Sequence, residues 1–375
     1  MTKETSSHSK ENDEQPLPPN QITKPLNPPD HTDTLRPNPK ELLNGAPLSL
    51  ARLKKFAGQN ILSVDDFTRE DVIEFARFAA FLEAVEIAPY HPLDGKIVIT
   101  AFFEASTRTR TSFESATLRL DGKIISIPDA AITGVKKGES IGDIGEMFNA
   151  YGDAVIMRHT ETEALKEILG NLRIPLINAG NGSGEHPTQA LTDWYALLKW
   201  RPALAHPFKG DPAERLHLGI MGTPGTMRAV KSFLLMSLLF KDHLRKITIV
   251  SEMADPLGPE LKNAIAASGI EFEVQADMST IVNDLDVVYM NSIALLGDSY
   301  RTMDSKYKLN AQSDLKPSAV ILHPLARLDE LDKSLDATAH NLYFTQAHGS
   351  VFVRQALLVA VLDRFHRLPE NSPLQ

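Results

Sequence analysis

The segment AFFEASTRTRTSFESATLRL occupies residues 101–120 and joins an apolar run to a turn rich in hydroxyl groups and arginines. Beyond the turn, Phe113, Ala116 and Leu120 recur at the spacing of one helix face, so a helix is predicted there. A buried strand that leads into a helix is the repeating unit of α/β folds. The segment therefore predicts an α/β protein, with this turn at the carboxyl end of a strand.

The turn itself has the composition of an anion site. Free backbone N–H groups and the positive end of the helix dipole favour an oxyanion at a helix N-terminus, and Arg108 can fork onto phosphate oxygens. A plain capping turn with solvated arginines is the alternative, because Ser106 or Thr107 alone would make an ordinary N-cap. Three small hydroxyl residues and two arginines directly after an apolar strand favour anion binding.

The same alternation of strand and helix patterns extends along the chain in two units. The first unit has predicted strands at residues 96–103, 154–157 and 174–179. The second unit has predicted strands at residues 216–221, 246–250, 271–274, 286–290 and 319–322. Helices are predicted at residues 69–85, 186–200 and 351–365. Residues 201–214, which include three prolines, form the best boundary between the two units.

Length and composition limit the kind of protein. At 375 residues the chain favours two domains, and its net charge of −9 disfavours nucleic-acid binding. The absence of cysteine excludes disulfides, thiolate nucleophiles and Cys-ligated metal sites. No apolar run approaches the roughly 18–20 residues of a membrane helix, and the N-terminus lacks a signal-peptide pattern. We therefore expect no membrane association and a cytoplasmic location.

The N-terminal region differs in composition from the rest of the chain. Residues 1–45 are polar and include eight prolines, so we expect a disordered tail, with a docking arm for another protein as the alternative. The expected organisation then has a first α/β domain at residues 46–200 and a second at residues 201–348. A C-terminal segment at residues 349–375 is expected to form a helix that packs back on the first domain.

Three further polar clusters lie at predicted strand ends or in loops. Lys136 and Lys137 could bring positive charge to an anion, although a solvated surface pair is the simpler interpretation. Arg158 ends a strand at the edge where α/β sheets bind ligands. His186 and Gln189 lie three residues apart at a helix start, so they project toward the same edge. Together these groups predict a site for a small, highly charged phosphate that carries a carbonyl group.

Six segments resemble the aspartate/ornithine carbamoyltransferase family, most closely its aspartate branch: FFEASTRTR, KKGE, VIMRH, NAGNGSGEHPTQALTD, LHPLARLDEL and VRQALL. The resemblance extends over about residues 61–365. It implies two doubly wound parallel-sheet domains, one for carbamoyl phosphate and one for an amino acid. It also implies carbamoyl transfer to L-aspartate in pyrimidine synthesis, a reaction that requires no cofactor, metal or covalent nucleophile. The departing phosphate can itself take the amine proton, which agrees with the lack of an obvious dedicated base.

The resemblance also assigns roles to particular residues. It implies that carbamoyl phosphate contacts Ser106, Thr107, Arg108, Thr109, Arg158, His186, Gln189 and Leu325. Arg108 would shield the leaving phosphate. Thr109, Arg158 and His186 would surround the carbonyl oxygen, so these three and Arg108 are the expected catalytic residues. Gln189 would accept a hydrogen bond from the amide nitrogen of the substrate.

The second substrate has fewer matches. Arg228 and Lys137 match residues that hold aspartate in the family. Thr133 and Lys137 also match a pair that enters the site of a neighbouring subunit, which implies a homotrimer with shared sites. However, Ser292 and Ala294 stand where the family has an arginine and a glutamine. An unpaired carboxylate is costly, so this loss bears directly on aspartate binding.

Three interpretations of this departure stay open. Arg301 could restore aspartate binding from the shortened loop, the enzyme could carbamoylate a different amine, or the chain could be a catalytically weak structural partner of another protein. Ala326 replaces the second proline of the family's HPLPR segment. Ornithine is disfavoured as the acceptor because the H-C-L-P signature of that branch requires a cysteine. A regulatory or pathway protein is a candidate partner.

Overall fold

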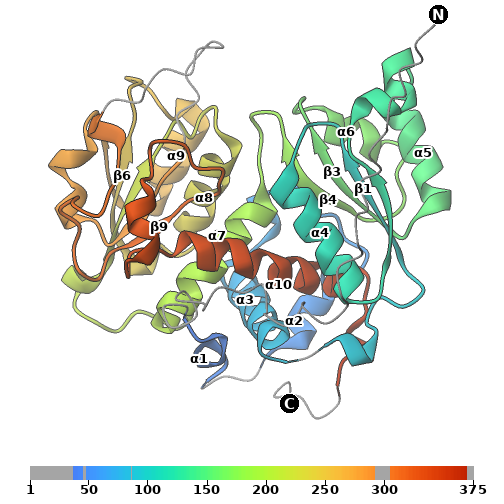
Figure 1. Ribbon diagram of the computed structural model, residues 1–375, viewed down its shortest axis with the longest axis horizontal. Helices are drawn as coiled ribbons and strands as arrows, with labels where there is room; N and C mark the ends of the chain where they lie inside the picture. Colours follow the sequence, from blue (N-terminus) through green and yellow to red (C-terminus); the bar gives the residue numbers. More distant parts are fainter. Residues whose placement is uncertain (1–36, 45–47, 86, 292–304, 370–375) are drawn as a thin grey trace, which may run out of the picture. The chain divides into compact units, whose positions relative to one another are not determined.

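The computed structural model describes residues 37–44, 48–85, 87–291 and 305–369. Ser292, Ala294, Arg301 and residues 1–36 therefore lie outside the described part of the chain. Residues 36–375 group into one unit with two parallel sheets, and one apolar cluster extends over both of them. The predicted α/β class with two parallel sheets is confirmed (Figure 1).

The first sheet has four parallel strands in the order β2-β1-β3-β4. The strands are β1 (Ile97–Phe102), β2 (Lys123–Ile127), β3 (Ala154–His159) and β4 (Leu176–Asn181). Alternate residues of β1 face opposite sides of the sheet. Ile99 belongs to the cluster formed with α5 (Ile141–Tyr151) and α6 (Ala164–Leu169). Val98 belongs to the cluster that includes α4 (Thr107–Arg119), so helices cover both faces.

The second sheet has five parallel strands in the order β7-β6-β5-β8-β9. The strands are β5 (Leu216–Met221), β6 (Leu244–Val250), β7 (Glu271–Gln275), β8 (Val287–Tyr289) and β9 (Val320–Leu322). Helices α8 (Arg228–Leu238) and α9 (Gly258–Ser268) cover one face. Single-turn 3₁₀ helices, including Met278–Thr280 and Ser305–Tyr307, contribute apolar side chains to the other face.

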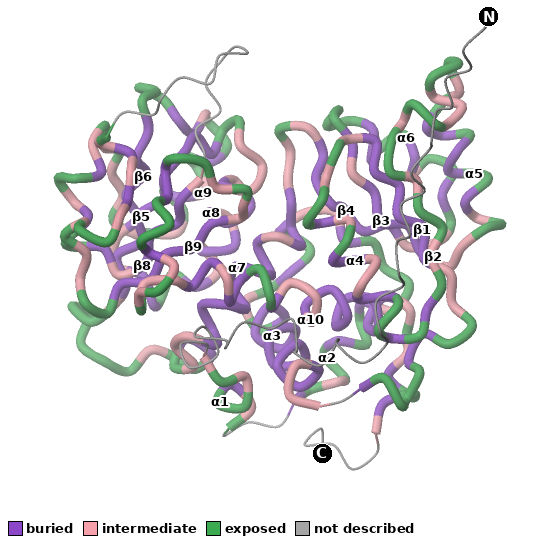
Figure 2. The backbone as a smooth tube through the Cα atoms, in the orientation of Figure 1, coloured by how far each residue is buried: buried purple, intermediate pink, exposed green. Residues whose placement is uncertain are grey.

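Three long helices form the most buried helical layer (Figure 2). They are α3 (Arg69–Ala84), α7 (Pro187–Trp200) and α10 (Tyr343–Val361), and α10 contacts α3, α4 and α7. Gly349 permits the close approach of α10 to α7, because a Cβ there would lie 2.9 Å from the ring of Tyr195. Helix α10 begins at Tyr343, before the predicted start at residue 351. Its first two turns, YFTQAHGS, were not predicted because they lack a regular apolar pattern.

Two further features differ from the sequence prediction. Residues 39–43 form α1 (Pro39–Leu43), capped by Asn38, and Leu42 is buried, so the predicted disordered tail of residues 1–45 extends too far. Strand β2 was not predicted, because KIISI alternates poorly and occupies a half-exposed sheet edge. None of the helices in the described ranges is long and apolar enough to cross a membrane.

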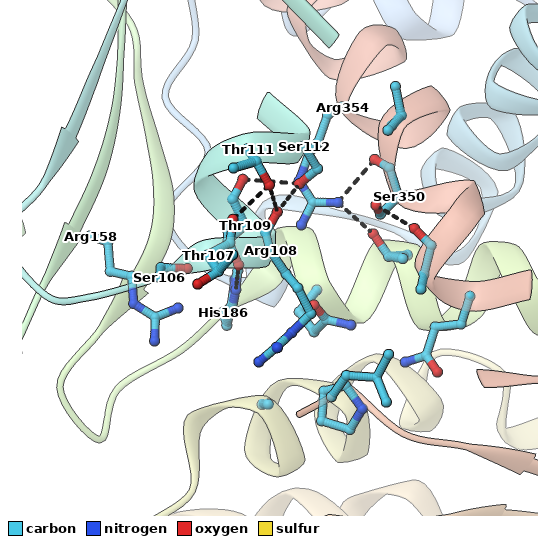
Figure 3. A pocket seen from close by; sticks show the side chains of 18 of the residues that line it. Ser106, Thr107, Arg108, Thr109, Thr111, Ser112, Arg158, His186, Ser350 and Arg354 are labelled. Carbon is cyan, nitrogen blue, oxygen red and sulfur yellow. Dashed lines mark hydrogen bonds between the residues drawn. The ribbon is translucent and has the colours of Figure 1, made fainter. Parts of the chain in front are cut away.

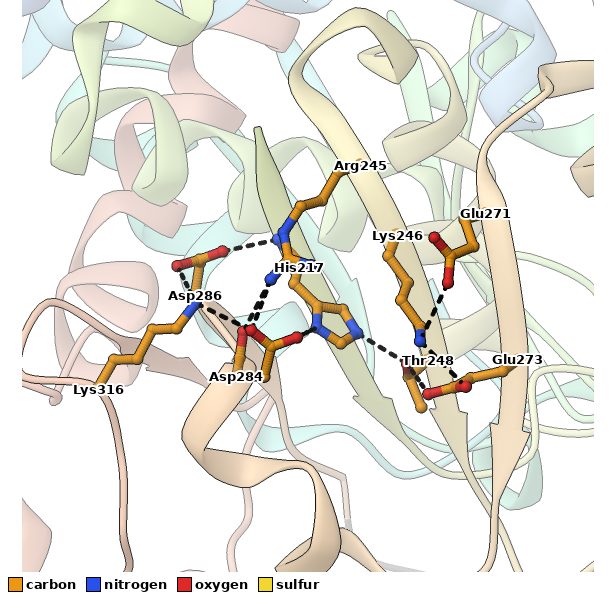
Figure 4. Close-up of polar contacts among 9 residues, drawn as sticks. All are labelled: His217, Arg245, Lys246, Thr248, Glu271, Glu273, Asp284, Asp286 and Lys316. Carbon is orange, nitrogen blue, oxygen red and sulfur yellow. Dashed lines mark hydrogen bonds and ion pairs between the residues drawn. The ribbon is translucent and has the colours of Figure 1, made fainter. Parts of the chain in front are cut away.

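A chain of polar contacts crosses the second sheet (Figure 4). His217 in β5 is buried, and its ring nitrogens lie 2.8 Å from an Asp284 carboxylate oxygen and 2.8 Å from the Thr248 hydroxyl. Thr248 donates in turn to Glu273 in β7. Burial lowers the pKa of His217, against the opposing effect of the Asp284 carboxylate. These contacts cross-link three adjacent strands and so stabilise the sheet.

Candidate active site

A cavity of about 710 Å³ lies where the polar turns of both sheets meet (Figure 3). It is lined by the start of α4, the end of β3, the starts of α7 and α8, the turns after β8 and β9, and the first half of α10. Every residue expected to bind carbamoyl phosphate lines it: Ser106, Thr107, Arg108, Thr109, Arg158, His186, Gln189 and Leu325. Arg228 lines it as well.

The turn before α4 has the geometry of an anion site rather than of a plain cap. Ser106 occupies the N-cap position, but its side chain accepts no hydrogen bond from the helix. Arg108 lines the cavity and makes no ion pair with any described residue. Partial burial lowers the pKa of the Arg108 guanidinium, yet arginine stays protonated at neutral pH. An uncompensated cation beside free helix amides favours an anionic ligand.

His186 at the start of α7 is buried and flanked by two hydroxyl groups. Its Nε2 lies 3.3 Å from the Thr109 hydroxyl, its Nδ1 lies 3.4 Å from the Thr188 hydroxyl, and its backbone N–H donates to Ser232. Burial, together with the nearby charges of Arg158 and other arginines, holds the pKa of His186 well below its ordinary value. The imidazole is therefore neutral at physiological pH and acts as a hydrogen-bonding group rather than as a cation.

Glu104 links two arginines that line the cavity. Arg158 donates to Glu104 Oε1 at 2.8 Å, and Arg228 donates to both carboxylate oxygens. Burial alone would raise the pKa of Glu104, but the hydrogen bonds and charges of Arg228 and Arg158 hold it below its ordinary value. The ionised carboxylate therefore compensates part of the positive charge and orients both guanidinium groups.

Comparison with known families accounts for both halves of this cavity. The family model "Aspartate/ornithine carbamoyltransferase, carbamoyl-P binding domain" matches residues 59–199. The model "Aspartate/ornithine carbamoyltransferase, Asp/Orn binding domain" matches residues 214–361. The chain belongs to the aspartate/ornithine carbamoyltransferase family. Both models lie within the described unit, and their junction falls in the loop between α7 and β5.

Similar proteins come from the aspartate branch of this carbamoyltransferase family. The aspartate carbamoyltransferase catalytic subunit of Pyrobaculum islandicum is 35% identical over 312 residues, which is 82% of this chain and 99% of the relative. The chloroplastic aspartate carbamoyltransferase of Arabidopsis thaliana is 33% identical over 83% of this chain and 79% of its own length. The aspartate transcarbamoylase of Trypanosoma cruzi, solved with N-(phosphonacetyl)-L-aspartic acid, is 26% identical, with a TM-score of 0.72 over 84% of this chain and 100% of that one.

Leu325 has an unusual backbone conformation in this carbamoyltransferase. Its φ of 54° is left-handed, which is rare for a branched side chain without a local constraint. The amide of Leu325 donates to Nδ1 of His323 at 2.8 Å, and Nε2 of His323 lies 2.7 Å from a carboxylate oxygen of buried Glu330. These contacts hold the turn after β9 against the cavity.

Two residues of the expected carbamoyltransferase site do not line the cavity of their own chain. Thr133 precedes the 3₁₀ helix Gly134–Lys137 and caps it by accepting from the amide of Val135. Lys137 is the last residue of the same helix. Their proposed role in a neighbouring subunit stays a prediction. Arg301, the third expected aspartate-binding residue, lies outside the described residues.

Two functional residues were not found from the sequence: Glu104, which pairs with two arginines of the cavity, and Arg354, which lines it. Glu104 lies in the turn between β1 and α4, but an acidic residue in a cationic turn gives no local indication of its two arginine partners. Arg354 in α10 is 1% exposed, donates to Thr192 and the Ser350 carbonyl, and stacks on Phe113. Burial lowers its pKa to about 10, so it still carries a positive charge at neutral pH. The sequence signal that could have identified Arg354 was its position in VRQALL, one of the six segments that resemble the family.

Proposed function

We propose that this chain transfers the carbamoyl group of carbamoyl phosphate to L-aspartate, which gives N-carbamoyl-L-aspartate and phosphate. The observation that carries the proposal is the cavity itself. It combines the uncompensated Arg108 at the start of α4 with neutral His186 and the paired Arg158 and Arg228. The first three suit a phosphate that bears a carbonyl group, and Arg228 suits the carboxylate of an acceptor.

The chemistry follows from the positions of these groups. The amine of aspartate attacks the carbonyl carbon, a new C–N bond forms, and negative charge develops on the carbonyl oxygen. Thr109, Arg158 and His186 line the cavity where they can donate to that oxygen, and removing one such donor typically costs about 10²–10³ in rate. The C–O bond to phosphate then breaks beside Arg108, and the departing phosphate takes the proton of the amine.

Burial of polar groups supports a bound anion. Nε of Arg158 and Nε of Arg354 are buried and have no hydrogen-bond partner within the described ranges. Buried donors normally have partners, and these two unpaired donors belong to arginines whose side chains line the cavity. A doubly charged acyl phosphate in the cavity would compensate the positive charge of both arginines.

Fewer described contacts are available to the acceptor than to carbamoyl phosphate. Arg228 already donates to Glu104 and to the carbonyl of Gly182, so an acceptor carboxylate would share its remaining donors. We propose Lys137 and Arg301 as further contacts for aspartate. Ser292 and Ala294, in place of the family's arginine and glutamine, favour a different amine as the second candidate acceptor.

We also propose that the chain functions in pyrimidine synthesis in the cytoplasm as a homotrimer with shared sites. Exposed apolar residues in the sequence before Thr133 support the assembly. Ile132, directly before Thr133, is 68% exposed, and Ile125 on the edge strand β2 is 39% exposed. Apolar groups at a sheet edge are a liability in an isolated subunit and suit burial against another copy.

Formation of a ureido product, followed by colour development, tests the proposed reaction. Carbamoyl phosphate is supplied with aspartate, asparagine, ornithine or other small amines, and the expected result is product from aspartate. Product from another amine, without product from aspartate, would replace the proposed acceptor. No product with any amine, despite calorimetric binding of carbamoyl phosphate, would favour a structural role for the chain.

A further inference from the structure

A buried carboxylate lies one helical turn from the cavity. Asp193 in α7 is completely buried and receives three hydrogen bonds from three different elements. Its Oδ1 accepts from Gln189 Nε2 at 2.7 Å and from Gln346 Nε2 at 2.5 Å, and its Oδ2 accepts from the Tyr289 hydroxyl at 3.0 Å. Gln189 and Gln346 line the cavity, whereas Asp193 does not. Asp193 therefore acts on the cavity only through its neighbours.

The chemistry of a carboxylate dictates the orientation of the Gln189 amide. An ionised carboxylate only accepts hydrogen bonds, so the amide must present its nitrogen to Asp193. The opposite end of the same amide, Oε1, then turns away from Asp193. Within the described part of the chain this oxygen has no hydrogen-bond partner, and Gln189 is only partly buried at the cavity wall. Oε1 of Gln189 is therefore available to accept a hydrogen bond from a ligand in the cavity.

We propose that Asp193 is a positioning residue that fixes Gln189 with its Oε1 toward the cavity, where it accepts from the amino group of carbamoyl phosphate. This inference rests on the proposed function, since it concerns the same substrate. A fixed acceptor favours a carbamoyl group, whose NH₂ donates, over an acetyl group, whose methyl group cannot. A site built for a donor disfavours the analogue that lacks it, because the acceptor is left unpaired.

The Asp193 carboxylate also fixes a second side-chain amide that lines the cavity, that of Gln346. Gln346 at the start of α10 donates to Asp193 and accepts at Oε1 from the backbone N–H of His323 at 2.9 Å. His323 begins the turn after β9 that carries Leu325. Through Gln346, Asp193 thus connects α7 to the turn after β9. The same carboxylate therefore fixes both Gln189 and the turn that carries Leu325.

Protonation of Asp193 leaves this orientation intact. Burial raises the pKa of Asp193 to about 7, although the hydrogen bonds from Gln189 and Gln346 oppose the shift. A proton on Oδ2 has an acceptor in the Tyr289 oxygen, because that hydroxyl can rotate. Oδ1 then continues to accept from both amides, so selection of the carbamoyl group should persist in both protonation states.

The test compares the affinities of carbamoyl phosphate and acetyl phosphate by calorimetry on the full chain. The wild type should prefer carbamoyl phosphate, and Asp193→Leu should reduce the ratio of the two dissociation constants roughly 2- to 10-fold, because Gln189 becomes free to turn. Asp193→Asn should keep the ratio, since its oxygen can still accept from both amides. In a Gln189→Leu background, Asp193→Leu should change the ratio no further.

Controls separate positioning from a general structural role. Tyr289→Phe removes one donor from the same carboxylate without touching Gln189, so it should keep the ratio even where it lowers the melting temperature. Asp193→Ala provides the same measurement if the leucine variant does not fold. An unchanged ratio in the variants that lack an acceptor at residue 193, or no preference in the wild type, would overturn the inference. A ratio that changes as expected, in a protein that makes no ureido product, would instead overturn the proposed transfer to aspartate.

Discussion

Arg228, the first residue of α8, donates two hydrogen bonds to the carboxylate of Glu104, which follows β1. The Nη1–Oε2 distance is 2.8 Å and the Nη2–Oε1 distance is 2.5 Å. Because β1 belongs to the first sheet and α8 covers the second, this ion pair joins the two halves of the cavity. Arg158 donates to the same carboxylate, so Glu104 also reduces the repulsion between two arginines.

Replacement of Glu104 by glutamine should weaken transfer to aspartate. The amide has nearly the same shape but loses the charge and one of the two acceptor oxygens. A hydrogen bond to a charged group contributes about 1.5–3 kcal/mol, so kcat/KM for aspartate should fall roughly 10- to 150-fold. Steady-state rates at saturating carbamoyl phosphate measure this value.

Glu146 offers a matched control for that substitution. It accepts paired hydrogen bonds from Arg173 at 2.6 and 2.7 Å, but both side chains are exposed and neither lines the cavity. Exposed ion pairs contribute little, so Glu146→Gln should leave kcat/KM unchanged. Equal effects of the two substitutions would contradict a specific role for Glu104.

Arg108→Ala should abolish the protection that phosphate gives against thermal unfolding. A ligand at 100 times its Kd stabilises a protein by about 2.7 kcal/mol, which is a measurable increase in Tm. Loss of the uncompensated cation should remove that increase. Arg110→Ala is the control, because Arg110 pairs with Glu114 and does not line the cavity, so its phosphate shift should persist. A full shift in the Arg108 variant would place the phosphate elsewhere.

Much of the fold and of the phosphate half of the site could be predicted, because their determinants are local. A strand, a turn and a helix in sequence define the residues around Arg108 without any long-range information. The apolar runs of β1, β3, β5 and β8 are visible for the same reason. Strand β2 was missed since its five residues are half-exposed, and the start of α10 was missed since its first turns are polar.

The remaining site residues depend on contacts between distant parts of the chain. Glu104 meets Arg228 across 124 positions, and Gln346 meets Asp193 across 153. A carboxylate inside a cationic turn, or a single aspartate on a helix, has no pattern that reveals such a partner. Ser292 and Ala294, which differ from the arginine and glutamine of the family, lie outside the described ranges. The sequence therefore predicted the residues around carbamoyl phosphate better than those around the acceptor.

His186 should stay neutral over the pH range of the assay. Its pKa is held well below 6.5 by burial and by the charges of Arg158 and Arg228, so the neutral form persists below the pKa of an ordinary histidine. Nitrogen-correlated spectra of protein labelled in the histidine rings should show no movement of the His186 signals from about pH 8 to about pH 5.5. His186→Gln identifies those signals. A titration centred near the ordinary histidine value would contradict a neutral hydrogen-bonding role.

Glu83 should make the protein sensitive to acid. Burial alone would raise the pKa of Glu83, but contacts with His348, Lys199 and Tyr195 outweigh burial and lower the pKa to about 2 from 4.5. A depressed acid pKa stabilises the fold above the unfolded value, and this contribution is lost as the pH falls through the folded value. The loss should reach roughly 3 kcal/mol between about pH 4.5 and pH 2.

Urea unfolding at a series of pH values measures this contribution of Glu83. Glu83→Gln should be less stable than the wild type at neutral pH, because the ion pair between Glu83 and the buried Lys199 is lost. The difference between the two proteins should then shrink as the pH falls from about 4.5, since the wild-type carboxylate takes up a proton that glutamine cannot bind. A constant difference across that range would show that Glu83 is not the group responsible.

Mixing two inactive variants tests whether the active site is shared between subunits. Lys137 does not line the cavity of its own chain, whereas Arg108 does, so the proposed trimer takes the two residues of one site from two subunits. Lys137→Ala and Arg108→Ala should each abolish activity alone. After the two variants are dissociated, mixed in equal amounts and reassembled, about one quarter of the sites should combine an intact Arg108 with an intact Lys137 from the neighbour. Activity should then recover to about one quarter of the wild-type value. No recovery after exchange of subunits, or full activity of Lys137→Ala alone, would mean that each chain builds its site without its neighbour.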